Sequence, residues 1–171
     1  MSPQIIFPVD LALGYIAWLL CFSVYIWPRL KAMDTISAQR AIATFHSFRF
    51  IGLVFLVPGV VGPHLPANFA VFSAYWDLAT ALLAILALLT VSVKPLFWLF
   101  VAAFNIVGTV DLLFDYRHAM SSGLSTMPGE LGAAYVIPVL IVPALMITHM
   151  AAFYMLIRPR STAVQTVVPR R

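Results

Sequence analysis

Residues 69–116 decide the fold, and they read FAVFSAYWDLATALLAILALLTVSVKPLFWLFVAAFNIVGTVDLLFDY. The stretch is apolar over roughly 50 residues, and its main interruption is the pair Lys94-Pro95. A bilayer core about 30 Å thick is crossed by roughly 20 helical residues, so the stretch is too long for one crossing. A cation followed by proline favours a tight turn. We therefore predict two membrane-spanning helices, over residues 69–93 and 96–116, joined by a short hairpin.

The composition of the whole chain agrees with this prediction. Of its 171 residues 63% are hydrophobic and only 9% are charged, and the mean hydropathy is +0.99. Soluble domains are about 45–50% apolar and about 25% charged, so the chain is neither a soluble globular domain nor a disordered one. The single Cys21 excludes a scaffold of internal disulfides. We expect an all-α, polytopic helical bundle in a membrane.

Three further apolar stretches are long enough to cross a bilayer, which gives five predicted transmembrane helices. The one domain expected from them covers residues 1–157. The basic segment 158–171 is expected to be a disordered cytoplasmic tail. The five predicted spans are residues 9–27, 41–61, 69–93, 96–116 and 131–157.

Lysine and arginine predict the orientation, because they accumulate in cytoplasmic loops. With the N-terminus outside and the C-terminus cytoplasmic, eight of the ten cations lie inside, Arg117 lies outside, and Arg49 lies within the second span. We expect a multi-pass protein of a bacterial inner membrane. Its cations lie beside spans rather than on a basic folded face, so nucleic acid is not an expected partner. The eight inner cations are Arg29, Lys31, Arg40, Lys94, Arg158, Arg160, Arg170 and Arg171.

Ionisable residues inside the spans carry most of the functional information. A charge near the bilayer centre costs about 2.5–3.5 kcal/mol on insertion scales, so each needs a partner, water or a function. Asp77 and Asp111 lie at comparable depths in neighbouring spans, and Asp115 lies one helical turn from Asp111. Each aspartate belongs to a small, polar stripe at helical spacing, which predicts that the two helices approach closely there. The stripes are Ser73, Asp77, Thr80, Ala84 and Ala87, and Asn105, Gly108, Asp111 and Asp115.

A second polar set is predicted in the inner half of the bundle. His46 and Arg49 are three residues apart and share a helix face, and His149 lies near the inner end of the last span. Arg49 either extends to lipid headgroups or faces the bundle, where it would bind a carbonyl, a ligand anion or Asn105. The sequence leaves open whether His46, Arg49 and His149 meet.

These residues support three functional hypotheses. The first is a polar intramembrane cavity, lined by Asp77, Asp111 and Asn105, that binds or passes a small or lipid-like molecule. The second is a membrane-embedded isomerase or oxidoreductase acting on an isoprenoid, sterol-like or quinone-like substrate, with the two aspartates as acid and base. The third is a structural subunit of a homo-oligomer or larger complex, in which the carboxyls are only structural. The candidate ligand-binding residues are Asp77, Asp111, Asn105, Asp115, Trp18, Tyr75, His46, Arg49 and His149.

The sequence predicts neither a cofactor nor a metal. Four histidines make a bis-histidine haem a weaker alternative, but the chain has no CxxCH attachment motif. It also has no tight group of His, Cys and carboxylate residues with the spacing of a zinc site.

The run Arg49 to Gly59, followed by Asp77 in an Ala- and Leu-rich helix, faintly resembles the small DoxX-type membrane proteins. Those proteins pair an Arg-Gly helix with an acidic one. The chain departs from that family in having Asp where the family usually has Glu, and in five predicted spans where the family has four helices. The chain is therefore not assigned to that family.

Overall fold

The computed structural model describes residues 3–157, and these residues form helices with no strands between them. The all-helical prediction is confirmed, whereas the predicted tail 158–171 lies outside the described residues. Short π and 3₁₀ segments connect or extend the α-helices. The α-helices are α1 (Pro3–Cys21), α2 (Trp27–Ala32), α3 (Thr35–His46), α4 (Ala67–Leu89), α5 (Lys94–Ser121) and α6 (Val142–Ile157); the other segments are η1 (Phe22–Ile26), η2 (Ser47–Leu56), η3 (Leu124–Thr126), η4 (Pro128–Tyr135) and η5 (Ile137–Ile141).

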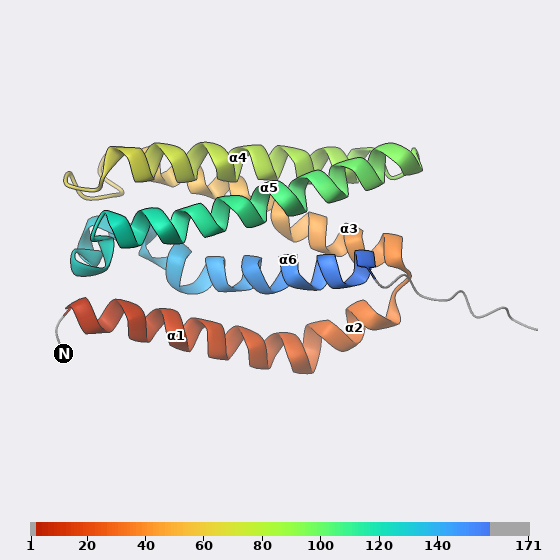
Figure 1. Ribbon diagram of the computed structural model, residues 1–171, viewed down its shortest axis with the longest axis horizontal. Coiled ribbons are helices and arrows are strands. Elements are labelled where there is room, and N and C mark those ends of the chain that lie inside the picture. Colours follow the sequence, from red (N-terminus) through yellow and green to blue (C-terminus); the bar gives the residue numbers. More distant parts are fainter. Residues whose placement is uncertain (1–2, 158–171) are drawn as a thin grey trace, which may run out of the picture.

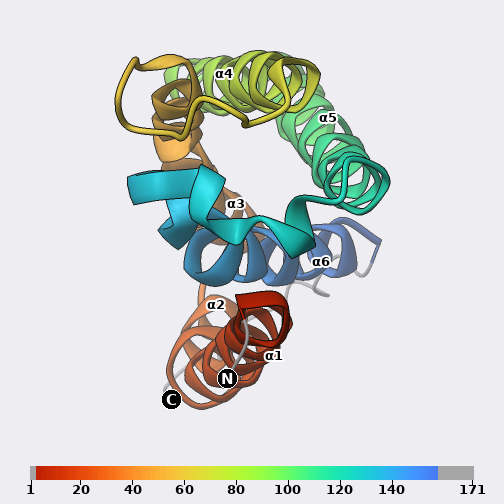
Figure 2. The ribbon, with the colours of Figure 1, turned by 90° about the vertical axis from the view of Figure 1, so that its left-hand side faces the viewer.

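The long helices lie side by side and run between two ends of the molecule (Figure 1). Viewed from one end, α3, α4, α5 and α6 surround the centre of the bundle, and α1 lies outside them against α6 (Figure 2). Many large apolar side chains of α1 are therefore exposed, including Leu13, Ile16 and Leu20. An apolar exposed surface of this kind is what a lipid-facing helix requires.

Within residues 3–157, four helical segments are long and apolar enough to cross a membrane: Gln4–Ala32, Ala67–Leu89, Lys94–Ser121 and Ile137–Ile157. They correspond to four of the five predicted spans, with shifted ends. The predicted span 41–61 is not a single long α-helix. It is divided between α3, which ends at His46, and the 3₁₀ segment η2, which ends at Leu56.

The hairpin predicted between residues 93 and 96 is present, a few residues earlier than expected. The α4 helix ends at Leu89, and the Val93 amide donates to the Thr90 carbonyl at 2.8 Å to close the turn. Lys94 and Pro95 then begin α5 rather than forming the turn. Proline is favourable there because the first helical amides have no intrahelical acceptor.

The predicted first span ends at residue 27, but the helical segment continues past Pro28. The π segment η1 precedes it, and the Trp27 amide donates to the Phe22 carbonyl, five residues back. Pro28 then lies in the first turn of α2, where its missing amide costs nothing, and the helix continues to Ala32. The Asp34 carboxylate caps α3 by accepting a hydrogen bond from the Ser37 amide at 3.0 Å. Hydrogen bonding to Ser37 lowers the pKa of this exposed carboxyl below its ordinary value.

The last predicted span begins later than expected, because residues 128–135 form the 3₁₀ segment η4 with a kink at Gly132. After this kink, Pro143 has no amide N–H, so it cannot donate the helical hydrogen bond to the carbonyl of Val139, four residues earlier. Gly14 of α1 packs against that carbonyl so closely that a Cβ atom would not fit. The Trp18 indole donates to the next carbonyl, Leu140, at 2.7 Å. These two contacts attach α1 to the η5–α6 segment.

Candidate functional site

Arg49 lies at the centre of the buried polar network. Its side chain extends from η2 between α4 and α5 and is almost fully buried, with 2% of the residue exposed. The Nε atom donates to Asp77 Oδ1 at 2.6 Å, and the Nη2 atom donates to Asp111 Oδ2. The Nη1 atom donates to the Gly108 carbonyl at 3.3 Å. One guanidinium group therefore connects η2, α4 and α5 through two ion pairs.

Two glycines make room for this arrangement. Gly52 lies one 3₁₀ turn after Arg49, and its backbone packs against the Asp77 carboxyl group with no space for a Cβ atom. A Cβ atom on Gly108 would lie 2.6 Å from both Arg49 Nη1 and His149 Nε2. Side chains at these positions would displace the groups that form the ion pairs.

The hydrogen bonds define which nitrogen of each buried histidine carries a proton. Because arginine only donates, His149 Nε2, 3.3 Å from Arg49 Nη1, is the acceptor. His149 Nδ1 then donates to Asn105 Oδ1 at 2.9 Å. The Thr148 hydroxyl donates to backbone carbonyls of its own helix, so it accepts the 3.0 Å bond from His46 Nε2. His149 is therefore neutral in this arrangement, whereas His46 Nδ1 is buried and has no partner among the described residues.

The cluster therefore holds more acidic groups than cations. Arg49 is its only cation, and it pairs with Asp77 and Asp111. Asp115 accepts a hydrogen bond from the Ser73 hydroxyl at 2.6 Å, and between residues 3 and 157 it forms no ion pair. The Oδ1 atom of Asp111 is buried and has no partner. Buried charge is stable only when it is compensated, so the part of the network around Asp111 and Asp115 favours an added proton or cation.

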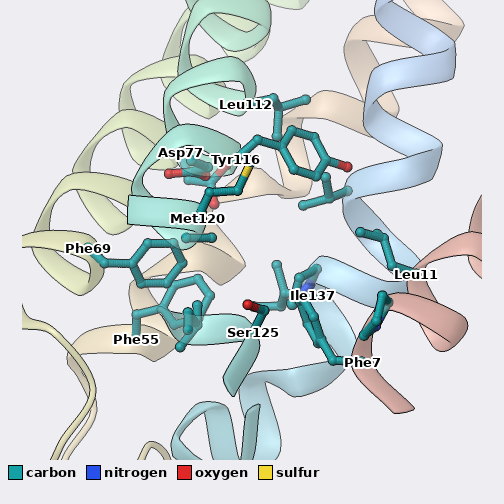
Figure 3. Close-up of a pocket in the computed structure, with 16 residues that line it drawn as sticks. Phe7, Leu11, Phe55, Phe69, Asp77, Leu112, Tyr116, Met120, Ser125 and Ile137 are labelled. Carbon is teal, nitrogen blue, oxygen red and sulfur yellow. The ribbon is translucent and has the colours of Figure 1, made fainter. Parts of the chain in front are cut away.

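A cavity of about 260 Å³ opens beside this network, between α1, α4, α5 and α6 (Figure 3). Its wall is mostly apolar, and Asp77 and Asp115 are among the residues that line it. Four aromatic rings, from Phe7, Phe55, Phe69 and Tyr116, line the same space. Other lining residues include Leu112, Met120, Leu124, Ser125 and Ile137.

The comparison with family models identifies the chain. The model described as "Domain of unknown function (DUF8737)" matches residues 6–157. The chain belongs to the DUF8737 family. Arg49, its two partner carboxyls and the cavity all lie within the matched DUF8737 domain. No curated protein and no solved structure matches the chain.

The DUF8737 domain joins the two polar sets that the sequence analysis treated separately. Arg49 contacts both aspartates and His149, so the inner and outer sets form one network. The burial of Arg49 is inconsistent with its extension to lipid headgroups. Of the acceptors expected for it, a carbonyl is present, whereas Asn105 contacts His149 instead. The sequence did not predict the ion pairs, although a lone arginine in one predicted span and two aspartates in other predicted spans were the available signal.

Two predicted site residues, Tyr75 and Trp18, lie elsewhere, and His46 lies at the edge of the network. Tyr75 is 57% exposed on α4 and does not line the main cavity. Trp18 lines a second apolar space of about 220 Å³, between η1, α3 and α6. His46 lies against His149 with the ring centroids 4.0 Å apart. That contact leaves no room for a porphyrin between the two rings, and no group of three or more metal-ligating side chains occurs within residues 3–157.

Proposed function

We propose that this DUF8737 protein is a multi-pass membrane protein that binds a small hydrophobic or lipid-like molecule in the 260 Å³ cavity. The observation that carries the proposal is an apolar, aromatic wall that includes two aspartates. Ligand sites are commonly apolar spaces with a few polar groups that orient the ligand. An apolar cavity of about 150 Å³ holds benzene, so this one suits on the order of ten non-hydrogen atoms.

Five membrane crossings with the N-terminus outside fit this proposal. The α3–η2 segment runs beside α4 between the two ends of the bundle (Figure 1), and its buried Arg49 is compensated there by two carboxylates. Arg29 and Lys31 near the end of α2 and Lys94 at the start of α5 lie at one end, whereas Arg117 lies near the other end of α5. The positive-inside tendency then favours a cytoplasmic location for the first end, as in a bacterial inner membrane.

Binding is favoured over acid–base catalysis by Asp77 and Asp111. Both carboxyls are ion-paired with Arg49. A general acid or base must reach the proton it transfers, and Asp111 is fully buried behind the cavity wall. The geometry therefore supports a structural and electrostatic role for this pair.

The test is photolabelling in nanodiscs with a ten-carbon alcohol that carries a diazirine. We expect mass spectrometry to place the label on buried cavity residues such as Leu112 and Leu124. The variant Ala119→Phe fills the cavity and should reduce that labelling several-fold. Ala79→Phe is the matched control, because Ala79 is exposed on α4 and is not a lining residue. Labelling confined to lipid-facing residues, and equal in both variants, would show that the cavity binds nothing of this class.

A further inference from the structure

The charge and shape of the cavity wall define the ligand more narrowly. Asp115 is the carboxyl group of the wall that no guanidinium neutralises, since both ion pairs of the described chain belong to Arg49. The hydroxyl of Ser73 satisfies one of its oxygens. His149 cannot supply the missing positive charge, because its Nε2 atom accepts from Arg49 and its one ring proton is donated to Asn105. His46 contacts Thr148 rather than Asp115. The wall therefore presents a carboxyl group that lacks a cationic partner among the described residues.

Aromatic rings surround the same space. Phe7, Phe55 and Phe69 contribute rings from α1, η2 and α4, and Tyr116 contributes one from α5. Phe55 and Phe69 contact each other edge to face, with centroids 5.7 Å apart. Aromatic faces attract ammonium groups through their quadrupoles, and the attraction grows where water is excluded. A carboxylate combined with aromatic walls thus selects a positively charged head on an apolar body.

We infer that the ligand of this cavity is an amphiphilic amine, whose ammonium group binds Asp115 and whose apolar part lies among the aromatic rings. The inference rests on the proposed function, and it specifies the chemical class that this function concerns. A neutral alcohol would donate one hydrogen bond to Asp115, whereas an ammonium group donates a stronger, charge-assisted one and compensates the buried charge. A carboxylic acid ligand would place two negative charges together.

The experiment compares three photoreactive ten-carbon probes that differ only in the head group: a primary amine, an alcohol and a carboxylic acid. The half-maximal concentration for labelling cavity residues is measured in nanodiscs for each probe. For the native chain, the amine should need about tenfold less probe than the alcohol. In Asp115→Asn the ratio should fall to about one. Comparing this ratio between variants cancels the unequal partition of the probes into lipid.

Two further variants keep the test decisive. Asp10→Asn is the matched control, because Asp10 accepts a hydrogen bond from Tyr135 and is not among the residues that line the cavity. It should retain the preference for the amine. Ser73→Ala removes the hydroxyl that donates to Asp115, so the preference for the amine probe over the alcohol should be kept or increased. This variant serves as the test of Asp115 if Asp115→Asn does not fold.

The outcomes separate the two proposals. Cavity labelling by amine and alcohol at equal concentrations, or strongest labelling by the acid, would overturn the inference and leave the binding function intact. A preference for the amine that survives in Asp115→Asn would also overturn it. Absence of cavity labelling by all three probes would overturn the proposed function itself.

Discussion

At the scale of the residue, the buried Arg49 is the most informative feature of the molecule. Its guanidinium group uses its planar, forked geometry to bind two carboxylates and a carbonyl from two helices. A lysine ammonium would not span the same acceptors, because its charge lies at a single point. Removing one partner of a buried ion pair is costly chiefly because the remaining charge is left uncompensated.

Replacing Arg49 with methionine should therefore destabilise the protein by about 3–5 kcal/mol. Unfolding in detergent measures the effect. Arg40→Met is the matched control, since Arg40 is exposed, and it should change stability by no more than about 0.5 kcal/mol. The triple variant R49M/D77N/D111N should recover part of the lost stability, because it removes the unpaired charges as well. Equal losses in Arg49→Met and Arg40→Met would show that the ion pairs contribute little.

At the scale of the element, α1 is joined to the bundle by few contacts. Gly14 lies against the Val139 carbonyl, which Pro143 leaves without its helical partner, and Trp18 binds the following carbonyl. The α1 helix also contacts α5, because the hydroxyls of Tyr15 and Tyr116 form a 2.6 Å hydrogen bond. Because α1 also supplies Phe7 to the cavity wall, its position determines whether that wall is closed.

Gly14→Leu should separate α1 from η5 and α6. The added side chain meets backbone, which cannot move aside as a flexible side chain would, so we expect a loss of about 1–3 kcal/mol. Ala17→Leu adds a similar volume to an exposed position of the same helix and should be nearly neutral. Thermal unfolding of both variants in the same detergent compares their stabilities. Similar stabilities of Gly14→Leu and Ala17→Leu would mean that α1 is not tightly packed at Gly14.

At the scale of the whole molecule, the apolar pattern predicted an all-helical bundle and the separation of α4 from α5. Helical spacing also indicated which residues share a face: Ser73, Asp77 and Thr80 are all buried, as is Asn105 on α5. Periodicity did not predict the 3₁₀ winding of η2, because tighter winding arises from packing rather than from local preference. Without it, Arg49 was assigned to a different depth from the aspartates, and the network that joins them was missed.

Cysteine accessibility tests the proposed topology. In a background with Cys21 replaced by serine, single cysteines at His64, Ser92 and Thr126 report on three connections between the helices. Five crossings with an outer N-terminus predict that a membrane-impermeant thiol reagent labels positions 64 and 126 in intact cells. Position 92 should react only after the membrane is opened. Labelling of position 92 in intact cells would exclude this orientation.

The central ion pairs also constrain how the protein is made. Arg49 leaves the ribosome 28 residues before Asp77 and 62 residues before Asp111. In the proposed five-crossing topology, the α3–η2 segment carries an uncompensated charge during that interval, and its insertion alone costs about 2.5–3.5 kcal/mol. The segment therefore gains a stable place in the bilayer only when α4 arrives with Asp77. Biogenesis of this bundle is thus expected to be cooperative, with the η2–α4 pair entering the lipid as one unit.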